Sequence, residues 1–454
     1  MPDDVPLLEL SSISVRRGRV NVLNSIDLKI SSGEVVLLIG ENGSGKSTLI
    51  EAAAGLLPLS TGEVRHSDQL VRDSEGRRSR PKPFGLALQS GGFSQDEFVD
   101  ERIATAVAVA GYEAESDWII AQLDEWSLRH RAKDRIAWLS GGMKRRVGVL
   151  AGIVPALASN EEKLILLDEP SEGLDEISIN TLQKQIASLA AAGHAIVIAT
   201  HDENLSSLAT RQLTVDKATI SEKEIAGPSQ TSKPPDCGTL EKSSENLLNN
   251  PSFKWANNLE KRTKNSTITR SVAGLIALVV IAGMLAQITA PSNQAWVALL
   301  ALTPPLISAL VRPGVLVHLS DSRAQDWWNA HLGNNLQMSR NLPPLTLIPF
   351  LLTLLSAYFV IGNIDLQIGL IAVAMAILGG GSARVHALES TFPRQGATMI
   401  ILLQLIFIWP FLLLVDLLSM DASTFATRDA EIQLLTALVI PFAIWLILPM
   451  IAPE

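Results

Sequence analysis

Gly40-Glu41-Asn42-Gly43-Ser44-Gly45-Lys46-Ser47 is the stretch that decides the fold of the first half of the chain. A glycine, four residues and then glycine-lysine-serine is the spacing of a phosphate-binding loop, provided that a strand precedes it and a helix follows. Val35 to Ile39 and Thr48 to Ala54 predict that strand and that helix. In such a loop backbone N–H groups surround a phosphate, Lys46 adds a positive charge, and the Ser47 hydroxyl can ligate Mg²⁺. We expect a triphosphate to contact Gly40, Asn42, Gly43, Ser44, Gly45, Lys46, Ser47 and Thr48.

A pair of carboxylates follows a second apolar run. Leu164 to Leu167 predicts a buried strand that ends at Asp168 and Glu169, and Ala195 to Ala199 predicts a third strand. Continuous apolar strands are typical of a sheet covered by helices on both faces. At the end of such a strand Asp168 can hold Mg²⁺ through water. Glu169 beside it is the natural base for an attacking water molecule.

Composition limits the classes of protein. The chain has 454 residues, room for two or three domains, and a formal charge of -9, which argues against a nucleic-acid binder. The single Cys237 excludes an internal disulfide and a cysteine-based zinc site, and we expect a free thiol. The acidic residues after Met1 lack the apolar core of a secretory signal, so we expect the first domain to stay in the cytoplasm.

The chain divides into three parts by composition. Residues 1–228 alternate strand-like and helix-like runs and predict an α/β domain, and residues 229–252 are rich in Ser, Pro, Lys and Asn and predict a linker. Residues 253–454 predict an all-α six-helix transmembrane domain. Phe253 to Arg262 at its start is either an amphipathic helix in the membrane interface or a solvated linker helix.

Six long apolar runs follow residue 270, each near the ~20 residues that a bilayer core requires. Pro304-Pro305 in the second run predicts a broken or kinked helix. The arginines between the runs concentrate in loops 312–342 and 384–396, which indicates a cytoplasmic location for these loops, the first domain and both termini. The expected spans are Ser271–Thr289, Ala295–Val311, Pro343–Ile361, Leu366–Ala383, Ala397–Leu418 and Ile432–Ile451.

Residues 7–225 resemble the ATP-binding cassette (ABC) ATPases, because Leu139-Ser140-Gly141-Gly142 lies between the phosphate-binding loop and Asp168 as that family's signature does. The resemblance implies an α/β P-loop ABC ATPase domain that binds ATP and Mg²⁺ and hydrolyses ATP. It implies that Gln89 senses Mg²⁺, that Ser171 to Asp175 forms the D-loop, and that His201 contacts the γ-phosphate. The signature at Ser140, Gly141 and Gly142 would face a nucleotide held by a second copy or a similar half-transporter. A dimer is therefore implied.

Two positions depart from this family. Met143 replaces the usual glutamine of the signature, and we expect activity to survive that change. Arg17-Gly18 lies where the family often has an aromatic residue that stacks on adenine. Either the guanidinium of Arg17 stacks on the base instead, or base recognition is loose.

Few side chains in the second half are candidates for a functional role. Ser320 to Ala330, with the pair Trp327-Trp328, predicts either a coupling helix that docks on the ATPase or a pair of headgroup-level anchors. Asp416 near a span end is a functional candidate or simply hydrated, and we favour hydration. Three loop histidines are either metal or heme ligands or, as we favour, ordinary loop residues: His318, His331 and His386.

The second half is similar to the permease of the c-type cytochrome maturation heme exporter. The similarity rests on Phe253–Arg262, Ala290-Pro291, Trp296–Leu300, Leu342-Pro343-Pro344 and Pro393–Gly396. It implies a fused half-transporter in the cytoplasmic membrane that exports heme or a related substrate, with heme-handling cytochrome maturation proteins as partners. The alternatives are an exporter of another substrate and an ATPase that remodels or releases a membrane partner, such as a heme chaperone, without moving a solute.

Overall fold

In the computed structural model the chain forms two compact units. Unit 1 comprises residues 1–255 and 318–338, and unit 2 comprises residues 256–317 and 339–454. The first unit therefore extends slightly beyond the predicted linker, which ends at residue 252. It also includes residues 318–338, which lie within the predicted transmembrane domain. The structure describes residues 5–216, 218–223, 240–242, 250–262, 272, 276, 294–311, 323–333, 344–362, 364–387, 403–425 and 427–451.

The described part of unit 1 contains three sheets. A four-stranded antiparallel sheet has the order β2 (Val20–Ile30), β1 (Leu8–Arg17), β4 (Thr61–His66), β5 (Gln69–Asp73). A two-stranded sheet pairs β12 (Glu241–Lys242) with β7 (Tyr112–Glu113). The six-stranded sheet has the order β11 (Thr219–Lys223), β10 (Arg211–Asp216), β3 (Val35–Ile39), β9 (Ala195–Ala199), β8 (Leu164–Asp168), β6 (Gly85–Ala87).

The six-stranded sheet confirms the three strands that the apolar runs predict. β3, β9 and β8 are parallel neighbours, and nearly all their residues are buried, because helices cover both faces. Their carboxyl ends lie at one edge, where parallel α/β sheets bind ligands. The phosphate-binding loop and Asp168 therefore meet at that edge.

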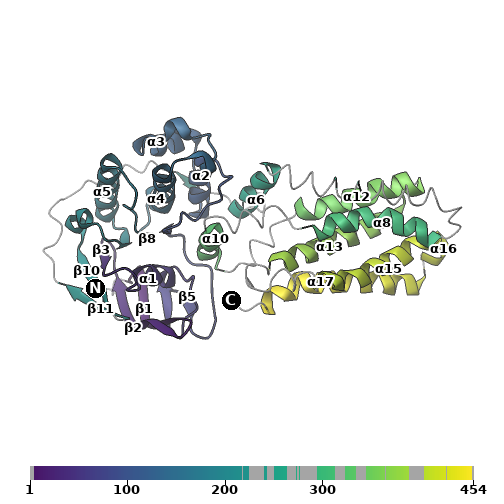
Figure 1. Ribbon diagram of the computed structural model, residues 1–454, viewed down its shortest axis with the longest axis horizontal. Coiled ribbons are helices and arrows are strands. Elements are labelled where there is room, and N and C mark those ends of the chain that lie inside the picture. The colour runs from purple at the N-terminus through teal and green to yellow at the C-terminus, as the bar shows by residue number, and fades with distance from the viewer. Residues whose placement is uncertain are drawn as a thin grey trace. The chain divides into compact units, whose positions relative to one another are not determined.

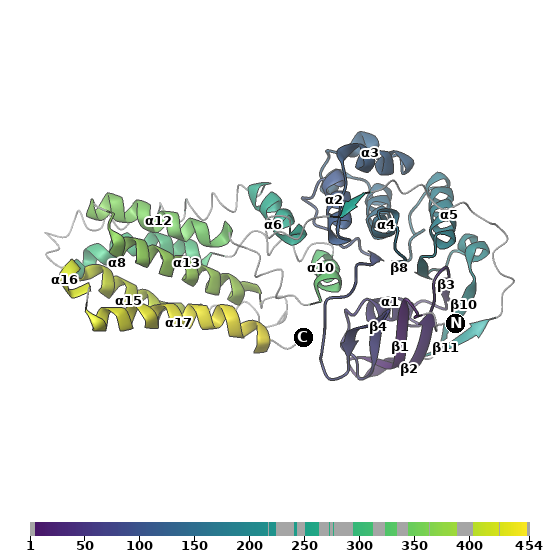
Figure 2. The same cartoon turned by 180° about the vertical axis from the view of Figure 1, so that it is seen from behind.

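Helices of unit 1 pack against its two larger sheets. The helix after the phosphate-binding loop, α1 (Lys46–Ala53), contacts strands of both larger sheets (Figure 1). Figure 2 shows three helices side by side: α2 (Val99–Val109), α4 (Gly141–Leu157) and α5 (Glu176–Ala191). The remaining helical segments are α3 (Ser116–Glu125), η1 (Arg129–Arg131), η2 (Ile136–Trp138), η3 (Glu203–Leu208) and α10 (Ala324–Leu332). α6 (Pro251–Arg262) crosses the boundary between the units.

The described part of unit 2 is all-helical. Its elements are α8 (Gln294–Leu310), α12 (Pro344–Ile361), α13 (Leu366–Ala387), η7 (Leu405–Phe407), α15 (Ile408–Ser419), α16 (Ala422–Phe425) and α17 (Arg428–Ile451). Five of the predicted spans coincide with α8, α12, α13, α15 and α17, and the first lies, apart from residues 272 and 276, outside the described residues. By length and composition, Leu366–His386 and Arg428–Leu446 of the described helices could cross a membrane. Gln294–Leu310, Leu347–Ile361 and Leu405–Ser419 are shorter apolar helices.

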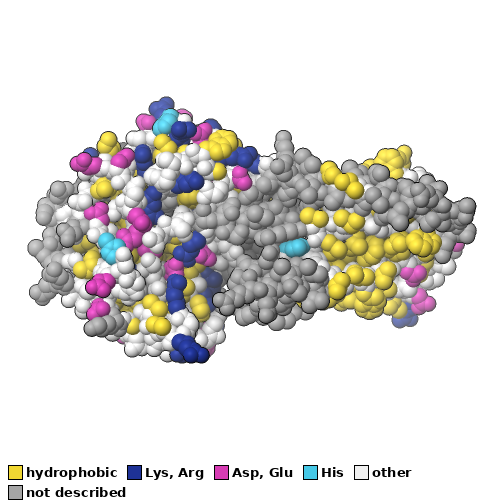
Figure 3. Space-filling view, viewed as in Figure 1, with side chains coloured by type: hydrophobic (Ala, Val, Ile, Leu, Met, Phe, Trp, Pro, Cys, Tyr) yellow, Lys and Arg dark blue, Asp and Glu magenta, His cyan; other side chains and the backbone are white. Residues whose placement is uncertain are grey.

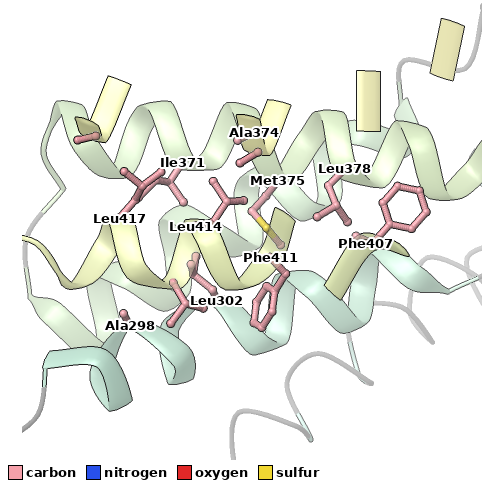
Figure 4. Packing of buried hydrophobic residues seen from close by; sticks show 14 of the residues in the cluster. Ala298, Leu302, Ile371, Ala374, Met375, Leu378, Phe407, Phe411, Leu414 and Leu417 are labelled. Atoms are coloured by element: carbon pink, nitrogen blue, oxygen red, sulfur yellow. The ribbon is translucent and has the colours of Figure 1, made fainter. Parts of the chain in front are cut away.

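The core of unit 2 forms around α13, which contacts α8, α12, α15 and α17. Figure 4 shows Met375 and Leu378 of α13 among side chains of the neighbouring helices, including Phe411 and Leu414. Gly381 allows one close approach, since a Cβ there would lie 2.9 Å from the carbonyl oxygen of Pro441 and 3.0 Å from the ring of Phe407. The absence of a side chain at Gly381 therefore lets these elements pack closely.

The sequence predicts a broken or kinked helix at Pro304-Pro305, and the break is wrong, because α8 continues through both prolines. Pro305 has no N–H for the carbonyl oxygen of Ala301, four residues earlier. The hydroxyl of Ser356 on α12 lies 2.5 Å from that oxygen and donates to it. A neighbouring helix thus satisfies the backbone acceptor that the proline leaves free.

Candidate nucleotide site

The phosphate-binding loop joins β3 to α1. Gly40 has φ +148°, and a Cβ there would lie 2.4 Å from the carbonyl oxygen of Val215 on β10, so the loop can pack against β10 only with glycine here. After the loop, the first N–H groups of α1 have no acceptor within the helix. Such a helix N-terminus is a ready site for an anion.

The ammonium of Lys46 lies at the centre of this loop. Its Nζ is 2.8 Å from the Gly40 carbonyl oxygen, 3.1 Å from that of Glu41 and 3.0 Å from His201 Nε2. Burial lowers the pKa of Lys46, while the nearby charges of Glu169 and Asp168 act in the opposite direction. The loop therefore holds a cation where a phosphate group would bind.

Ser47 and Asp168 meet as the predicted Mg²⁺ ligands. Ser47 Oγ donates to Asp168 Oδ1 at 3.0 Å, and Asp168 is only 1% exposed. Asp168 Oδ2 is buried without a hydrogen-bond partner among the described residues. Burial raises the pKa of Asp168 to about 6. A buried carboxylate oxygen without a partner beside a hydroxyl fits a hard cation with oxygen ligands, such as Mg²⁺.

Gln89, the third predicted Mg²⁺ ligand, has a different contact. Its side-chain Nε2 donates to Glu172 Oε2 at 3.3 Å. Gln89 thus lies beside the predicted D-loop, while Ser47 and Asp168 contact each other directly. The three predicted ligands do not share one contact in this structure.

Glu169 and His201 face each other at the end of β8 and β9. Glu169 has φ +50°, a left-handed conformation that is uncommon for a residue with a side chain. Its Oε1 lies 3.3 Å from His201 Nε2, and the backbone N–H of His201 donates to Oε2 at 3.2 Å. Since His201 Nε2 also contacts Lys46, three residues far apart in the sequence converge on one point. A carboxylate held there can accept a proton from a water molecule.

Arg145 is a site residue that the sequence analysis missed. Its Nη1 donates to the carbonyl oxygens of Leu88 and Gln89 at 3.0 and 2.9 Å, and its Nη2 donates to those of Asp168, at 2.5 Å, and Glu169. Arg145 is buried, and burial lowers its pKa. One guanidinium therefore fixes the backbone at Gln89 relative to the Asp168–Glu169 pair. Its position one turn into α4 carries no signal of these partners.

The remaining predicted residues lie at two helix N-termini, in the phosphate-binding loop, in α1 and at the end of β1. Ser140 is the N-cap of α4, and its Oγ accepts from the Met143 N–H at 3.3 Å, while Gly141 and Gly142 are the first residues of that helix. Asp175 is the N-cap of α5, accepts from the Ser178 N–H at 2.9 Å, and lies 3.4 Å from Arg146. Asn42 is exposed in the loop and Thr48 is buried in α1. Arg17 ends β1 and forms an ion pair with Glu51 at 2.5 Å.

One curated relative is matched over nearly the whole of its own length by about half of this chain. The ATP-binding protein LolD of the lipoprotein-releasing system of Anaplasma marginale is 34% identical over 225 residues, which cover 48% of this chain and 97% of LolD. The chain belongs to the ABC transporter family. The family model described as ABC transporter matches residues 23–172, which contain the phosphate-binding loop, Ser140 and the Asp168–Glu169 pair of the ABC ATPase domain.

Other ABC proteins are longer than the matched region. A putative ABC transporter ATP-binding protein of Streptomyces avermitilis is 32% identical over 50% of this chain and 40% of its own length. The macrolide export ATP-binding/permease protein MacB of Azoarcus sp. is 35% identical over 45% of this chain and 32% of its own length. The chain thus spans about a third to two-fifths of these relatives. A dimeric ATP-binding cassette structure with ADP and phosphate has 22% identity, a TM-score of 0.42, and coverage of 48% of this chain and 99% of its own.

The helix α10 packs within unit 1, against the ABC ATPase domain. Trp327 and Trp328 are 0% and 1% exposed. The Trp327 ring stacks under the guanidinium of Arg102 at 3.8 Å and faces Gly92. Arg78 Nη2 donates to the Asn329 carbonyl oxygen at 3.0 Å. The tryptophans therefore contact protein, which confirms docking on the ATPase and makes the headgroup-anchor alternative wrong.

Trp255 of α6 also packs against protein side chains. Its ring lies 5.5 Å from that of Trp328 in a T-shaped arrangement, and Trp255 is buried. The predicted amphipathic helix is present as α6, but its only tryptophan packs on α10 and does not anchor in a headgroup layer.

The loop histidines do not form a ligand cluster in the described part of the chain. His331 stacks on Trp327 and Phe84, and His386 of unit 2 lies 2.9 Å from the Leu310 carbonyl oxygen. His318 and Cys237 lie outside the described residues. No group of three possible His, Cys, Asp or Glu ligands occurs among the residues that the structure describes.

Three buried histidines among the described residues should make unit 1 sensitive to acid: His194, whose pKa burial lowers to about 4, and the two rings beside Phe84. Burial lowers the pKa of His66 to about 4 and that of His331 to about 3, and both rings contact Phe84. Between those values and the ordinary pKa of about 6.5, the unfolded chain binds protons that the folded chain excludes. Stability is therefore full above about pH 6.5 and falls as the pH is lowered, by about 2 kcal/mol per histidine at pH 5.

Thermal unfolding of the whole protein, measured between pH 5 and 7.5, checks this expectation. His331→Gln should make the melting temperature less dependent on pH. His130→Gln is the matched control, because His130 is exposed. An equal pH dependence in wild type and His331→Gln would contradict the assignment.

Proposed function

We propose that this chain is an ATP-driven half-transporter that couples ATP hydrolysis in residues 1–228 to movement of a substrate through residues 253–454. The observation that carries the proposal is the convergence of Lys46, His201 and Glu169 beside the Ser47–Asp168 pair. Residues with phosphate-binding, metal-binding and basic chemistry meet there, as hydrolysis of a triphosphate requires.

Each residue then has a definite task. Lys46 and the N–H groups at the start of α1 bind the phosphates. Ser47 and Asp168 would hold Mg²⁺, and Gln89 would join them after releasing Glu172. The ion, when bound, neutralises charge that develops on the phosphate oxygens. Glu169 orients and deprotonates the attacking water, and His201, within 3.3 Å of Glu169, contacts the terminal phosphate. Arg145 fixes the backbone of Gln89 and Glu169 so that these tasks occur in one place.

A second copy completes the site in this proposal. Gly141 and Gly142 present free N–H groups at the N-terminus of α4, which is suited to an anion. In the proposed dimer this terminus faces a nucleotide held by the other copy. Asp175, the N-cap of α5, would lie at the same dimer interface.

The helices of unit 2 support a location in a bilayer. Exposed apolar side chains recur every three or four residues along α12 and α17, which gives each helix an apolar outer face. Hydrophobic side chains cover much of the described surface of unit 2, whereas charged side chains are scattered over unit 1 (Figure 3). A surface of this kind fits lipid better than water. The exposed residues are Leu347, Leu351, Leu355, Phe359, Ile432, Leu435, Val439, Phe442 and Leu446.

The packing of α10 supports the proposed topology. This helix lies between α8 and α12 in the chain and yet packs within unit 1. The loop 312–342 must then lie on the same side of the membrane as the ATPase domain, in the cytoplasm. Asp416, which is exposed near the end of α15, would lie toward the opposite side and be hydrated.

The direction and substrate of transport rest on similarity. MacB is named for macrolide export and the related protein PvdT of Pseudomonas syringae for pyoverdine export, which favours export for this chain. Heme export, with heme-handling cytochrome maturation proteins as partners, rests only on the sequence resemblance of residues 253–454. Remodelling of a membrane partner without transport is the second candidate, since LolD is named for lipoprotein release.

Transport should be separable from hydrolysis at Trp327. We expect Trp327→Ala in proteoliposomes to reduce ATP-dependent uptake more than tenfold, while ATP hydrolysis stays within about threefold of wild type. The reason is that deleting a buried indole removes about 3–5 kcal/mol of packing between α10 and the ATPase domain. Uptake of zinc mesoporphyrin, as a heme analogue, and of erythromycin is measured beside phosphate release.

Trp409→Ala, at a 56% exposed tryptophan of unit 2, is the matched control and should retain both activities. If wild-type protein hydrolyses ATP in liposomes but moves neither probe, the partner-remodelling function is favoured. If Trp327→Ala transports at the wild-type rate, α10 does not transmit the work of hydrolysis.

A further inference from the structure

The carboxylate of Glu51 joins two arginines from distant parts of the chain. Glu51 lies on α1 and is 5% exposed. Its Oε2 is 2.5 Å from Arg17 Nη2 and its Oε1 is 2.6 Å from Arg323 Nη1. Arg17 ends β1, whereas Arg323 immediately precedes α10. One buried anion therefore links a β-strand of the ATPase domain to the segment that docks on it.

The position of Glu51 brings this link close to the nucleotide site. Glu51 is four residues after Ser47 on α1, so both lie on one face of the helix, about 6 Å apart along its axis. Arg17 is thus held within one helical turn of the residues that would bind phosphate and Mg²⁺. Its side chain is 55% exposed, so it can turn toward a bound nucleotide.

The two arginines differ in how firmly they are held. Arg323 is 32% exposed and has a second partner, Asp326, at 2.6 Å. Burial alone would lower the pKa of Arg323, but the charges of Glu51 and Asp326 outweigh it and raise the pKa overall. A buried carboxylate is costly without a cation beside it. If Arg323 leaves, Arg17 must stay with Glu51, and if Arg323 is present, Arg17 can leave.

We propose that Glu51 is a positioning residue that couples docking of α10 to the engagement of the nucleotide base by Arg17. This inference rests on the proposed ATP-binding function. With α10 docked, Arg323 keeps Glu51 neutralised, so Arg17 can leave its pair with Glu51 when a nucleotide base is there to contact. By linkage, a base that takes Arg17 leaves Glu51 to Arg323 alone and strengthens docking by the same factor.

A double-mutant cycle on the full-length protein in detergent tests the coupling. The probes are the Mg²⁺ complexes of a non-hydrolysable ATP analogue and of inorganic tripolyphosphate, which has no base, titrated by calorimetry. We expect Arg323→Gln to weaken binding of the ATP analogue about fivefold, a typical coupling between two sites. The same substitution in the Glu51→Gln protein should have no effect, because Arg17 is then free. Arg323→Gln should leave tripolyphosphate affinity unchanged in both Glu51 backgrounds.

Two variants separate this role from a structural one. Arg323→Lys keeps a cation beside Glu51 and should restore affinity, and Asp326→Asn removes only the other partner of Arg323 and should not weaken ATP binding. An equal loss in both Glu51 backgrounds, or an equal loss for tripolyphosphate, would overturn the coupling. Failure of the ATP analogue to bind the wild-type protein at all would instead overturn the proposed function.

Discussion

Glu169→Gln should reduce ATP hydrolysis by at least about 100-fold while leaving ATP affinity within about threefold of wild type. General-base catalysis contributes about 10²–10⁴ to the rate, and an amide cannot accept the proton of the attacking water. Binding should survive, because the carboxylate of Glu169 contacts His201 and not the phosphate-binding loop. Phosphate release at saturating MgATP measures the first quantity, and calorimetric titration measures the second.

The same variant tests the proposed dimer. If hydrolysis separates two copies that share nucleotides, Glu169→Gln should accumulate as a dimer with MgATP, which size-exclusion chromatography with light scattering detects. Asp117→Asn removes one negative charge from an exposed site on α3 and should behave as wild type. Normal turnover in Glu169→Gln would show that another group is the base. A preparation that remains monomeric with MgATP would contradict the shared site.

Lys46→Ala should weaken nucleotide binding by about 100-fold. The ammonium supplies hydrogen bonds to charged phosphate oxygens, each worth about 1.5–3 kcal/mol. No other lysine contacts the loop carbonyls of Gly40 and Glu41 among the described residues. Fluorescence titration with a labelled ATP analogue gives the affinity directly.

The control for this prediction is Lys184→Ala, because Lys184 is an exposed lysine on α5. It should bind nucleotide as wild type does. Circular dichroism should show that Lys46→Ala keeps its secondary structure, so that lost binding is not lost folding. Unchanged affinity in a folded Lys46→Ala protein would refute the phosphate-binding role of residues 40–47.

Much of unit 1 was predictable because its signals are local in sequence. Strands buried on both faces must be continuously apolar, so β3, β8 and β9 could be recognised from their composition alone. The loop before α1 needs glycines at fixed spacing because its backbone must approach phosphate closely. Long apolar runs likewise predicted α12, α13 and α17, since a helix that faces an apolar environment has no need of a polar side.

Some contacts could not be predicted, because they join residues that are distant in the sequence. Arg145 lies within a helix that gives no sign of its four carbonyl partners. For Arg17 the sequence left open whether the guanidinium stacks on a base, and the structure pairs it with Glu51. α8 continues through Pro305, and the Ala301 carbonyl oxygen that this proline leaves free accepts from Ser356 on another helix. In each case a polar group finds its partner only after the chain has folded.

The sequence alone determined the ATP-binding cassette and the apolar character of the second half, because both are written in the order and spacing of neighbouring residues. Tertiary structure alone decided that Trp327 and Trp328 lie in protein and not at a lipid headgroup layer. It also decided that Glu51 connects Arg17 with Arg323. An amphipathic tryptophan pair has the same pattern in either environment, and a carboxylate on a helix does not specify its cation. Only the burial of these groups beside a particular partner distinguishes the alternatives.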